Sequence, residues 1–585
     1  MAKQPQEERI CLSTLKSRGW TDSLIKKHLP EPMLVTNPHY TRAPEMKLWY
    51  LSEIERIEKE VDEFQKRKEK LAKKNAAKEM RRQEAIRQKE ERIARFTSEL
   101  NVRNPALDYP LARNMARHFI LNVGDTNTGK TYQALQALKA AETGVYLAPL
   151  RLLAMEVQDR LLDDGVLCSM VTGEEENLVE DAQIMSSTVE KIDLTKTYEV
   201  GVIDECQMIA DDARGGSWTR AILGLAAETI YLCMSPDAEN ICKKLIDMCG
   251  DTYEVHKCTR NTELIFEGKT DERFLQRNDA VILFSRKKVL AFAEMVKQKY
   301  KLTPSVVYGA LPYKARKQQV ELYNEGKTDI IIATDAIGMG MNLPIKRVVF
   351  AETEKFDGVV RRPLYASEVK QIAGRAGRRG IFEKGYVAAF QQANTINDKL
   401  KAKNRIIQKA HVPFPHDALK HSSEPLSVVL NEWAQVQYPE IFTQQNIELM
   451  AEKAEYLEEN YPMLRREEML KLTMVMFDEK DEELYGLWER YVQFYVSGIE
   501  IRMPKPNEVC YNLQVNEHSY KELDLYYSFH KTMELDFDYD ELMSRKEALV
   551  EMINKCLLET NKKLKKKKKN IQNTPRKRDK RRRVH

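Results

Sequence analysis

Short apolar runs alternate with stretches of helical periodicity through the middle of the chain, from about residue 105 to 410. Continuous apolar strands separated by helices are typical of parallel sheets that are covered on both faces. The region is long enough for two such units, and we place the break near residues 250–260. The pattern therefore predicts an α/β fold with one domain at 105–252 and a second at 253–410. The expected strands are 119–123, 144–147, 198–203, 229–234, 280–284, 305–308, 329–333 and 347–350.

The N-terminal flank is helical in pattern and highly charged. Residues 1–45 predict a small helical module, in which Thr21 caps a short helix that Pro30 ends. Residues 46–104 predict a long charged helix, whose apolar residues follow the spacing of a short coiled coil at each end. The polar stretch between these ends favours a solvated helical arm or a short antiparallel pair over a sustained coiled coil. A charge run is usually a solvated face, but the basic side could also contact nucleic acid, and residues 46–100 could bind a protein partner. The seam residues are Ile54, Ile57, Val61, Phe64, Ile93, Phe96 and Leu100.

The C-terminal flank is also helical in pattern and ends in a basic run. Residues 411–558 predict a helical accessory region interrupted by prolines. Residues 559–585 are rich in lysine and arginine, have no apolar core and are expected to be disordered. This tail could tether nucleic-acid phosphates, serve as a nuclear-type address or keep the chain in solution. Its dense positive charge slightly favours the tether.

Composition and the N-terminal sequence argue against several classes of protein. Charged residues make up 31% of the chain, and the net charge is +5. No apolar run is long enough for a membrane helix, so we expect no membrane partner. The nine cysteines include no C-x-x-C pair, which favours buried thiols over a zinc module. The polar N-terminus fits neither a secretory signal nor a transit peptide, which favours the cytoplasm of a bacterium or phage-infected cell over a mitochondrion.

A glycine-rich loop of the form G-x-x-x-x-G-K-[ST] runs from Gly124 to Thr131, after an apolar run and before a helical one. Its glycines let backbone N–H groups turn toward phosphate oxygens, and the following helix N-terminus attracts the same oxygens. Lys130 would neutralise the β- and γ-phosphates of ATP, and the Thr131 hydroxyl would bind Mg²⁺. The expected nucleotide ligands are Gly124, Thr126, Asn127, Thr128, Gly129, Lys130 and Thr131.

Two adjacent carboxylates, Asp204 and Glu205, follow the expected strand 198–203. Ligands bind at the carboxyl ends of parallel strands. Asp204 can therefore hold Mg²⁺, and Glu205 can orient and deprotonate an attacking water. An isolated Asp-Glu pair is usually a solvated strand end, but the phosphate loop earlier in the chain favours the catalytic interpretation.

Three arginines stand among small residues in the segment 371–380 of the second predicted domain. Arginine offers a planar fork of donors that suits phosphate. Arg375 and Arg378 could therefore act across a cleft on a nucleotide held by the first domain. A basic glycine loop that binds nothing in particular is the alternative.

Taken in order, these three motifs resemble motifs I, II and VI of superfamily 2 helicases. The segments between them are similar to the Suv-three family, which contains the ATP-dependent RNA helicase of the mitochondrial degradosome and bacterial relatives. The resemblance covers about 115–395 and is weaker from 411 to about 500. The segments that carry it are 148–154, 172–175, 218–221, 308–312 and 333–343.

The resemblance implies two tandem RecA-like domains, with ATP and Mg²⁺ as cofactors. It implies that Gln207 links the nucleotide to the parts that move the strand, and that Gln371, Arg375 and Arg378 contact the γ-phosphate. Asp125, Thr128 and Cys206 depart from the usual family residues without removing a phosphate or metal ligand, and the third motif at 234–237 is looser. The residues implied to line a nucleic-acid track are Arg151, Thr172, Gly173, Ser285, Thr334 and Gly340.

The expected activity is ATP-driven movement along single-stranded or tailed duplex nucleic acid, with separation of the duplex. The resemblance implies 3′-to-5′ movement and favours RNA over DNA. A nucleic-acid-stimulated ATPase or remodeller that does not unwind is an alternative. A nucleic-acid-binding scaffold with a vestigial ATP site is another, although the intact motifs argue against it.

Overall fold

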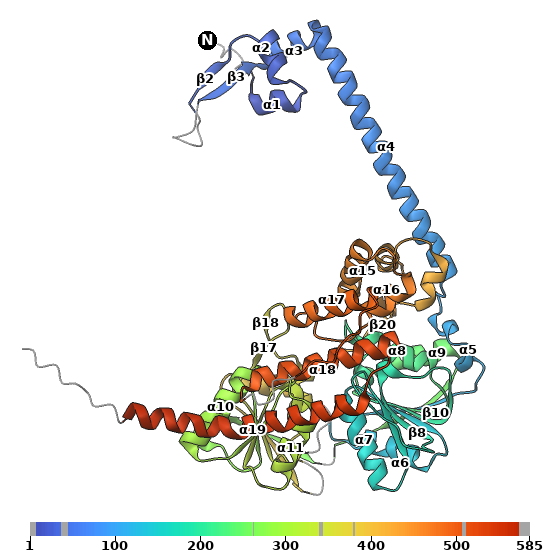
Figure 1. The fold of residues 1–585 in the computed structure, drawn as a ribbon, viewed down its shortest axis with the longest axis vertical. Helices are drawn as coiled ribbons and strands as arrows, with labels where there is room; N and C mark the ends of the chain where they lie inside the picture. The colour runs from blue at the N-terminus through green and yellow to red at the C-terminus, as the bar shows by residue number, and fades with distance from the viewer. Residues whose placement is uncertain are drawn as a thin grey trace, which may run out of the picture. The chain divides into compact units, whose positions relative to one another are not determined.

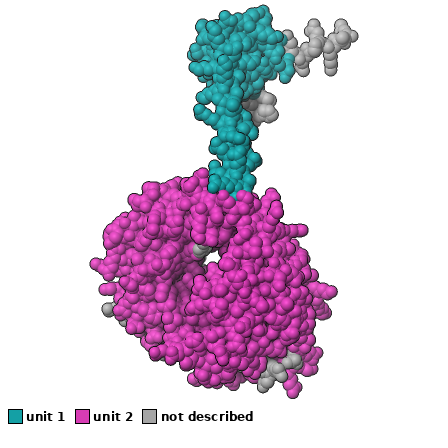
Figure 2. All heavy atoms as spheres, turned by 90° about the vertical axis from the view of Figure 1, so that its right-hand side faces the viewer, with its two compact units in different colours: residues 1–95 teal, residues 96–585 magenta. Residues whose placement is uncertain are grey.

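The structure is a computed structural model that describes residues 8–36, 45–260, 262–338, 343–377, 381–505 and 511–572. The chain forms two compact units, residues 1–95 and residues 96–585. Figure 1 labels the elements, and Figure 2 colours the units separately and shows a hollow in the surface of the second unit. In the described ranges, no helix has both the length and the apolar character that crossing a membrane requires.

The first unit contains a small antiparallel sheet in the order β1-β3-β2. The Thr21 hydroxyl accepts a hydrogen bond from the Leu24 amide at 3.3 Å, which confirms the predicted helix cap. The expectation of a purely helical module was wrong, because strands of three to five residues are too short to show a clear alternating pattern. The elements are β1 (Arg9–Cys11), α1 (Leu12–Ser17), α2 (Asp22–His28), β2 (Met33–Val35), β3 (Met46–Tyr50), α3 (Leu51–Glu60) and α4 (Asp62–Glu99).

The apolar seam of the charged helix packs inside the first unit. Ile54 of α3 and Phe64 of α4 are buried with Trp20, whose ring stacks on Phe64 at 4.5 Å between centroids. Phe96, near the other end of α4, belongs to the core of the second unit. The prediction of a short coiled coil is therefore corrected, because an apolar stripe at this spacing serves any partner that a helix packs against.

The first lobe of the second unit, residues 105–257, is built on a sheet in the order β11-β4-β10-β9-β5-β8-β6-β7. All neighbouring strands are parallel except β6 and β7. The strands are β4 (His118–Val123), β5 (Gly144–Ala148), β6 (Cys168–Val171), β7 (Glu176–Asn177), β8 (Ile184–Thr188), β9 (Thr197–Ile203), β10 (Ala226–Met234) and β11 (Thr252–Lys257). The helices are η1 (Pro105–Asp108), α5 (Pro110–Arg113), α6 (Lys130–Ala140), α7 (Arg151–Asp163), η2 (Val189–Lys191), η3 (Cys206–Ala210), α8 (Gly215–Gly224) and α9 (Glu239–Cys249).

The sheet of the first lobe extends further along the chain than the expected boundary at residue 252. Strand β11 pairs with β4 in parallel over the register Thr252↔His118 to Lys257↔Val123. The pattern of β11 alternates over a short span, with Tyr253 and Val255 packed against the core and polar residues between them, and it has no continuous apolar run. Two apolar residues are too few to distinguish such an edge strand from a loop in the sequence, so the boundary was placed too early.

The second lobe, residues 263–401, is built on a sheet in the order β12-β19-β16-β13-β15-β14, in which every neighbouring pair is parallel. The two parallel sheets confirm the predicted α/β class. The strands are β12 (Glu263–Lys269), β13 (Asp279–Ile282), β14 (Pro304–Val307), β15 (Ile330–Ala333), β16 (Arg347–Phe350) and β19 (Lys384–Ala389), with a separate hairpin of β17 (Glu354–Phe356) and β18 (Arg361–Pro363). The helices are η4 (Glu272–Phe274), α10 (Arg286–Tyr300), α11 (Tyr313–Asn324), η5 (Asp335–Gly338), α12 (Ala366–Ala373) and α13 (Ala393–Lys401).

The rest of the second unit, residues 410–572, is mainly helical, as expected. Its last helix, α19, continues to Gln572, so part of the segment expected to be a disordered tail is helical; residues 573–585 lie outside the described residues. The elements are β20 (Ala410–Val412), η6 (His416–His421), α14 (Leu426–Trp433), β21 (Phe442–Gln444), α15 (Glu448–Asn460), α16 (Arg466–Thr473), α17 (Glu482–Val496), α18 (Leu513–Met533) and α19 (Tyr539–Gln572).

Candidate nucleotide site and nucleic-acid track

The glycine-rich loop joins β4 to α6. Gly129 caps the helix at φ 82°, a left-handed conformation that costs glycine little, and Asn127 is also left-handed at φ 66°. Lys130 is 7% exposed, and its ammonium group donates to the carbonyl oxygens of Gly124 and Asp125 at 3.3 Å each. The loop therefore carries its positive charge where phosphate oxygens bind in loops of this type.

Asp204 lies at the end of β9 and accepts hydrogen bonds from three directions. The Thr131 hydroxyl donates to Oδ1 at 3.2 Å, the Tyr146 hydroxyl to Oδ2 at 2.8 Å, and the Glu205 amide to Oδ1 at 2.9 Å. Burial raises the pKa of Asp204 to about 6, and the neighbouring charge of Glu205 adds to the rise. The Thr131 hydroxyl and the Asp204 carboxylate are oxygen ligands of the kind that Mg²⁺ prefers, so these residues fit that ion.

Glu205 turns sharply out of the strand. Its backbone is left-handed at φ 50°, which is strained for a residue other than glycine and is common at functional sites. The Gln207 amide donates to the Glu205 carboxylate, and its carbonyl oxygen accepts from the Ser235 amide at 3.2 Å. Gln207 therefore connects Glu205 to the loop that follows β10, which is the looser third motif of the sequence.

The phosphate loop touches the second lobe directly. The Asn127 amide group donates to the Gly377 carbonyl oxygen at 3.2 Å. A Cβ atom added to Gly374 would lie 2.6 Å from the Cβ atom of Thr126, so the two backbones pack closely there. The segment that follows α12 and the loop before α6 are thus in direct contact across the boundary between the lobes, which we call the cleft.

Arg375 lies inside this cleft. Its guanidinium group donates to the Gly338 carbonyl oxygen, at 3.0 Å from Nε and 2.5 Å from Nη2. Burial lowers the pKa of Arg375, while the carboxylates of Glu205 and Asp204 counteract this effect. The structure therefore brings Arg375 into the electrostatic field of the two acidic residues of the first lobe, and Arg378 lies outside the described residues.

The connector between the lobes also reaches the cleft, which the sequence did not predict. Arg260 donates to the Gly374 carbonyl oxygen at 3.0 Å and to that of Ala376. A Cβ atom added to Gly124 would lie 2.4 Å from the carbonyl oxygen of Cys258. Residues 258–260 thus contact both the phosphate loop and the arginine segment, and no motif in the sequence marks them.

Three of the expected track residues gather at one edge of the first lobe. Arg151 forms an ion pair with Glu175 at 2.7 Å and another with Glu174, and it donates to the Tyr520 hydroxyl at 3.4 Å. The Thr172 hydroxyl donates to the Glu175 carbonyl oxygen at 2.8 Å. The guanidinium group of Arg151 is therefore held by carboxylates, and Thr172 stabilises the turn that positions them.

The C-terminal helices cover this edge. A Cβ atom added to Gly173 would lie 1.9 Å from the methyl carbon of Met476. Lys546 of α19 is 2% exposed, and it donates to the Glu174 carbonyl oxygen at 3.1 Å. The expected track in the first lobe is thus bounded by the helical region.

The same helices contact the second lobe. Glu517 of α18 accepts from the Tyr308 hydroxyl at 2.6 Å and pairs with Arg286 at 2.7 Å. Ser285 caps α10 by accepting from the Lys288 amide at 3.3 Å, next to this contact. Helix α18 therefore bridges both lobes, through Tyr520 on one and Glu517 on the other.

The other expected residues lie in the second lobe. The Thr334 hydroxyl accepts from the Ala336 amide at 3.3 Å. The side chain of Gln371 lies against Gly338, where an added Cβ atom would be 3.6 Å from its Cγ atom. Gly340 lies outside the described residues. Within the described part of the chain, no cluster of three or more His, Cys, Asp or Glu side chains could hold a metal ion.

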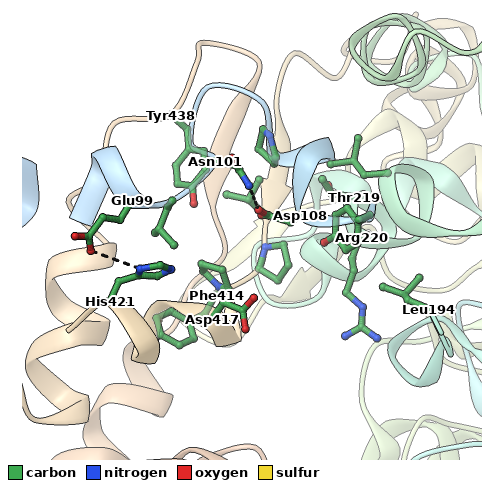
Figure 3. A pocket seen from close by; sticks show the side chains of 17 residues that line it. Glu99, Asn101, Asp108, Leu194, Thr219, Arg220, Phe414, Asp417, His421 and Tyr438 are labelled. Carbon is green, nitrogen blue, oxygen red and sulfur yellow. Dashed lines mark hydrogen bonds and ion pairs between the residues drawn. The ribbon is translucent and has the colours of Figure 1, made fainter. Parts of the chain in front are cut away.

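A separate cavity of about 360 Å³ lies beside α8, between that helix and the segment around His421 (Figure 3). An ion pair between His421 and Glu99 at 3.5 Å lies at its wall, and Arg220 of α8 forms part of the lining. Trp218 of the same helix donates to the Asp204 carbonyl oxygen at 2.9 Å. The cavity therefore lies beside the helix that contacts the end of β9, and among the described residues none of the predicted site residues lines it.

Comparison with known proteins matches two regions of the chain to helicase families. Residues 105–258 match the DEXQ-box helicase domain of Suv3, and residues 266–380 match the helicase conserved C-terminal domain. Among solved structures, S. cerevisiae Dbp5 bound to RNA and ADP BeF3 gives a TM-score of 0.38 at 15% identity, over 61% of this chain and 91% of that chain. That similarity is weak.

Curated relatives give a stronger match. The chain is 38% identical to the ATP-dependent RNA helicase SUV3L of Oryza sativa subsp. japonica, over 68% of this chain and 53% of that protein. It is 36% identical to the DExH-box ATP-dependent RNA helicase DExH16 of Arabidopsis thaliana, over 67% of each, and 36% identical to SUV3 of Oryza sativa subsp. japonica, over 68% of this chain and 67% of that protein. The chain thus spans about half of the first relative and two thirds of the other two.

The names of these three relatives all include the word mitochondrial, as do those of relatives from Candida albicans and Saccharomyces cerevisiae. This finding overturns the expectation of a cytoplasmic protein in a bacterium or phage-infected cell. The matched regions hold the phosphate loop, the Asp204–Gln207 motif and the arginine segment in the predicted order. The chain belongs to the Suv3 family of DEXQ-box helicases.

Proposed function

We propose that this protein is an ATP-dependent RNA helicase that moves along one strand and separates a duplex in its path. The observation that carries the proposal is the direct contact between the lobes, where Thr126 packs on Gly374 and Asn127 donates to Gly377. A nucleotide held by the phosphate loop contacts both sides of this cleft. ATP therefore favours the closed cleft, and loss of the γ-phosphate removes that preference.

The site residues have distinct roles in this proposal. Lys130 neutralises the phosphates, and Thr131 and Asp204 hold Mg²⁺, which supplies positive charge beside them. Glu205 orients the attacking water and accepts its proton. Because Gln207 bonds to Glu205 and to the loop after β10, it relays the state of the nucleotide to that loop. Arg375, together with Arg378 and Gln371, contacts the γ-phosphate from the second lobe.

RNA is the proposed substrate, because each of the three relatives is named as an ATP-dependent RNA helicase. The strand contacts Arg151, Thr172, Gly173, Ser285, Thr334 and Gly340 along the lobes, mainly through its backbone. Movement is 3′-to-5′, and RNA is preferred over DNA. The preference and the polarity are tested by ATPase stimulation with each single strand, followed by displacement of duplexes with a tail on either end.

The decisive variant is Glu205→Gln, which keeps the size of the side chain and removes the base. We expect it to bind ATP and to lose turnover of ATP, because water is no longer deprotonated. Glu228→Gln is a matched control, since Glu228 is an exposed residue on β10. Normal hydrolysis by the Glu205 variant would refute the proposed site. ATPase activity of the wild type without displacement of any tailed duplex would instead indicate a translocase that does not unwind.

A further inference from the structure

Helix α4 carries an unusual row of basic residues. Lys66, Lys70, Lys74, Lys78 and Arg82 follow one another at intervals of four residues, which places successive side chains on neighbouring turns of the helix. An α-helix rises 1.5 Å per residue, so the row is about 24 Å long. All five residues are exposed. We call this row the basic ridge.

The basic ridge lies in a part of α4 that differs in charge from the rest of the helix. From residue 66 to 82 there are nine basic and two acidic residues, whereas residues 83–99 contain four of each. In the second half, Arg87 pairs with Glu84 at 2.8 Å and with Glu91 at 3.5 Å. A solvated helix normally mixes its charges as this second half does.

The ridge is not neutralised within the described part of the chain. The structure gives Lys70, Lys74, Lys78 and Arg82 no ion pair with a described carboxylate. Like charges four residues apart destabilise a helix, so the ridge weakens α4 wherever no anion covers it. A ligand with regularly spaced negative charge removes that repulsion and releases its own counterions on binding.

The composition of the ridge selects among anionic ligands. Between residues 66 and 82 there is no aromatic side chain on which an unpaired base could stack, and stacking is what single-strand binding surfaces use. The exposed apolar residues are too few for insertion into a membrane: Met80 is 73% exposed but has no large apolar neighbour within that stretch of the exposed face. A duplex, with one negative charge for about every 1.7 Å of its axis, matches a bare row of cations best.

We propose that the basic ridge of α4 binds the sugar-phosphate backbone of duplex nucleic acid, independently of its sequence. The ridge is then a second contact of the protein with its substrate, separate from the nucleotide cleft and the single-strand track. The inference rests on the proposed function only for the class of ligand, since the contact itself needs neither ATP nor movement.

The test uses the full chain with Lys70, Lys74, Lys78 and Arg82 all changed to Gln. Glutamine is a good helix former and removes the repulsion, so α4 remains helical. The probes are a labelled blunt-ended RNA duplex and the same duplex as DNA, with binding measured over a series of salt concentrations. For duplex DNA each phosphate contact contributes about 0.9 to the slope of log K against log salt, so four lost contacts lower the slope by about 3 to 4. The affinity at low salt falls about tenfold or more.

Two matched variants control for net charge. Changing Arg87, Lys89, Arg92 and Arg95 to Gln removes the same four charges from the balanced half of α4, and it should leave the slope nearly unchanged. Changing Lys70, Lys74 and Lys78 to Arg keeps the charge and should keep the binding. An unchanged slope in the ridge variant, or an equal fall in both Gln variants, would overturn the inference.

Two further measurements distinguish duplex binding by the ridge from a general loss of activity and from membrane binding. ATPase stimulation by single-stranded RNA should be the same in the ridge variant as in the wild type. Its absence in the wild type would count against the proposed function and not against the ridge. Sedimentation with vesicles that contain phosphatidylserine tests a membrane ligand. Vesicle binding that depends on the ridge, with duplex binding unchanged, would overturn the inference.

Discussion

Gly374 packs closely against the phosphate loop of the other lobe, and Gly374→Ala tests whether this approach is needed for catalysis. The added Cβ atom would lie 2.6 Å from the Cβ atom of Thr126 and 3.2 Å from its Cγ2 atom. Atoms do not approach to 2.6 Å, so either the loop or the end of α12 must move. The backbone of Gly374 is right-handed at φ −58°, a conformation that alanine adopts freely, but the added Cβ atom would also lie 2.8 Å from the Lys370 carbonyl oxygen of its own segment.

The expected size of the effect follows from the packing. Overfilling a well-packed contact costs about 1–3 kcal/mol. The part of this cost that comes from Thr126 falls on the closed cleft alone, because Thr126 and Gly374 belong to different lobes, whereas the part that comes from Lys370 is present in both states. A cost of that size lowers the population of the closed state by about 5- to 150-fold. We therefore expect ATP turnover to fall by up to a similar factor, while the thermal unfolding temperature falls only slightly, through the contact with Lys370.

The assay is steady-state ATP hydrolysis with saturating single-stranded RNA, together with thermal unfolding. Gly338→Ala is the matched control, because its added Cβ atom would meet the nearest carbon atoms of Gln371 and Ile372 at 3.6 Å, an ordinary contact distance. Equal turnover in the two variants would refute the reasoning. A large fall in the unfolding temperature of Gly374→Ala with unchanged turnover would also refute it, since the contact would then stabilise the fold and not the closed state.

Three other predictions follow from individual contacts. Tyr146→Phe removes the hydroxyl that donates to Asp204 at 2.8 Å, and a hydrogen bond to a charged group contributes about 1.5–3 kcal/mol. The Mg²⁺ concentration for half-maximal ATPase activity should therefore rise. An unchanged Mg²⁺ dependence would contradict this. Arg151→Ala leaves two carboxylates without their cation and should destabilise the fold by about 3 kcal/mol, measured by chemical unfolding. A loss of RNA affinity with unchanged stability would instead mean that Arg151 serves only to bind RNA phosphates. The hydroxyls of Ser13 and Thr14 lower the pKa of Cys11 to about 6. The thiolate therefore dominates above that pH, and alkylation by iodoacetamide should reach half its maximal rate near pH 6. In the Ser13→Ala variant this midpoint should rise.

The sequence predicted best the elements whose functional residues stand close together in the chain. The phosphate loop needs its glycines, its lysine and its threonine within eight positions, so the spacing alone identifies it. Asp204 and Glu205 follow an apolar run directly, so the strand end that carries them was also visible. In both cases residues close together in the sequence determine the geometry of the site, and distant residues only add further contacts to it.

The features that the sequence did not reveal depend on contacts between distant segments. Arg260 binds carbonyl oxygens more than a hundred positions away, and nothing in its neighbourhood indicates them. The apolar spacing of α3 and α4 suggested a coiled coil, but the same spacing fits the Trp20 side of the first unit equally well. Arg151 was expected to contact single-stranded nucleic acid. Its acidic partners became evident only from the structure, in which the turn after β6 and helix α18 lie beside it.

The connector at residues 258–260 has a mechanical consequence. Because it touches Gly124 of one lobe and Gly374 of the other, the corner beside the triphosphate tail is where the lobes have least freedom to part. When the lobes rotate about this corner, the atoms next to it move least and the atoms at the far edge of each lobe move most. In the proposed function, a small displacement beside the phosphates of ATP therefore corresponds to a larger displacement of the bound nucleic acid.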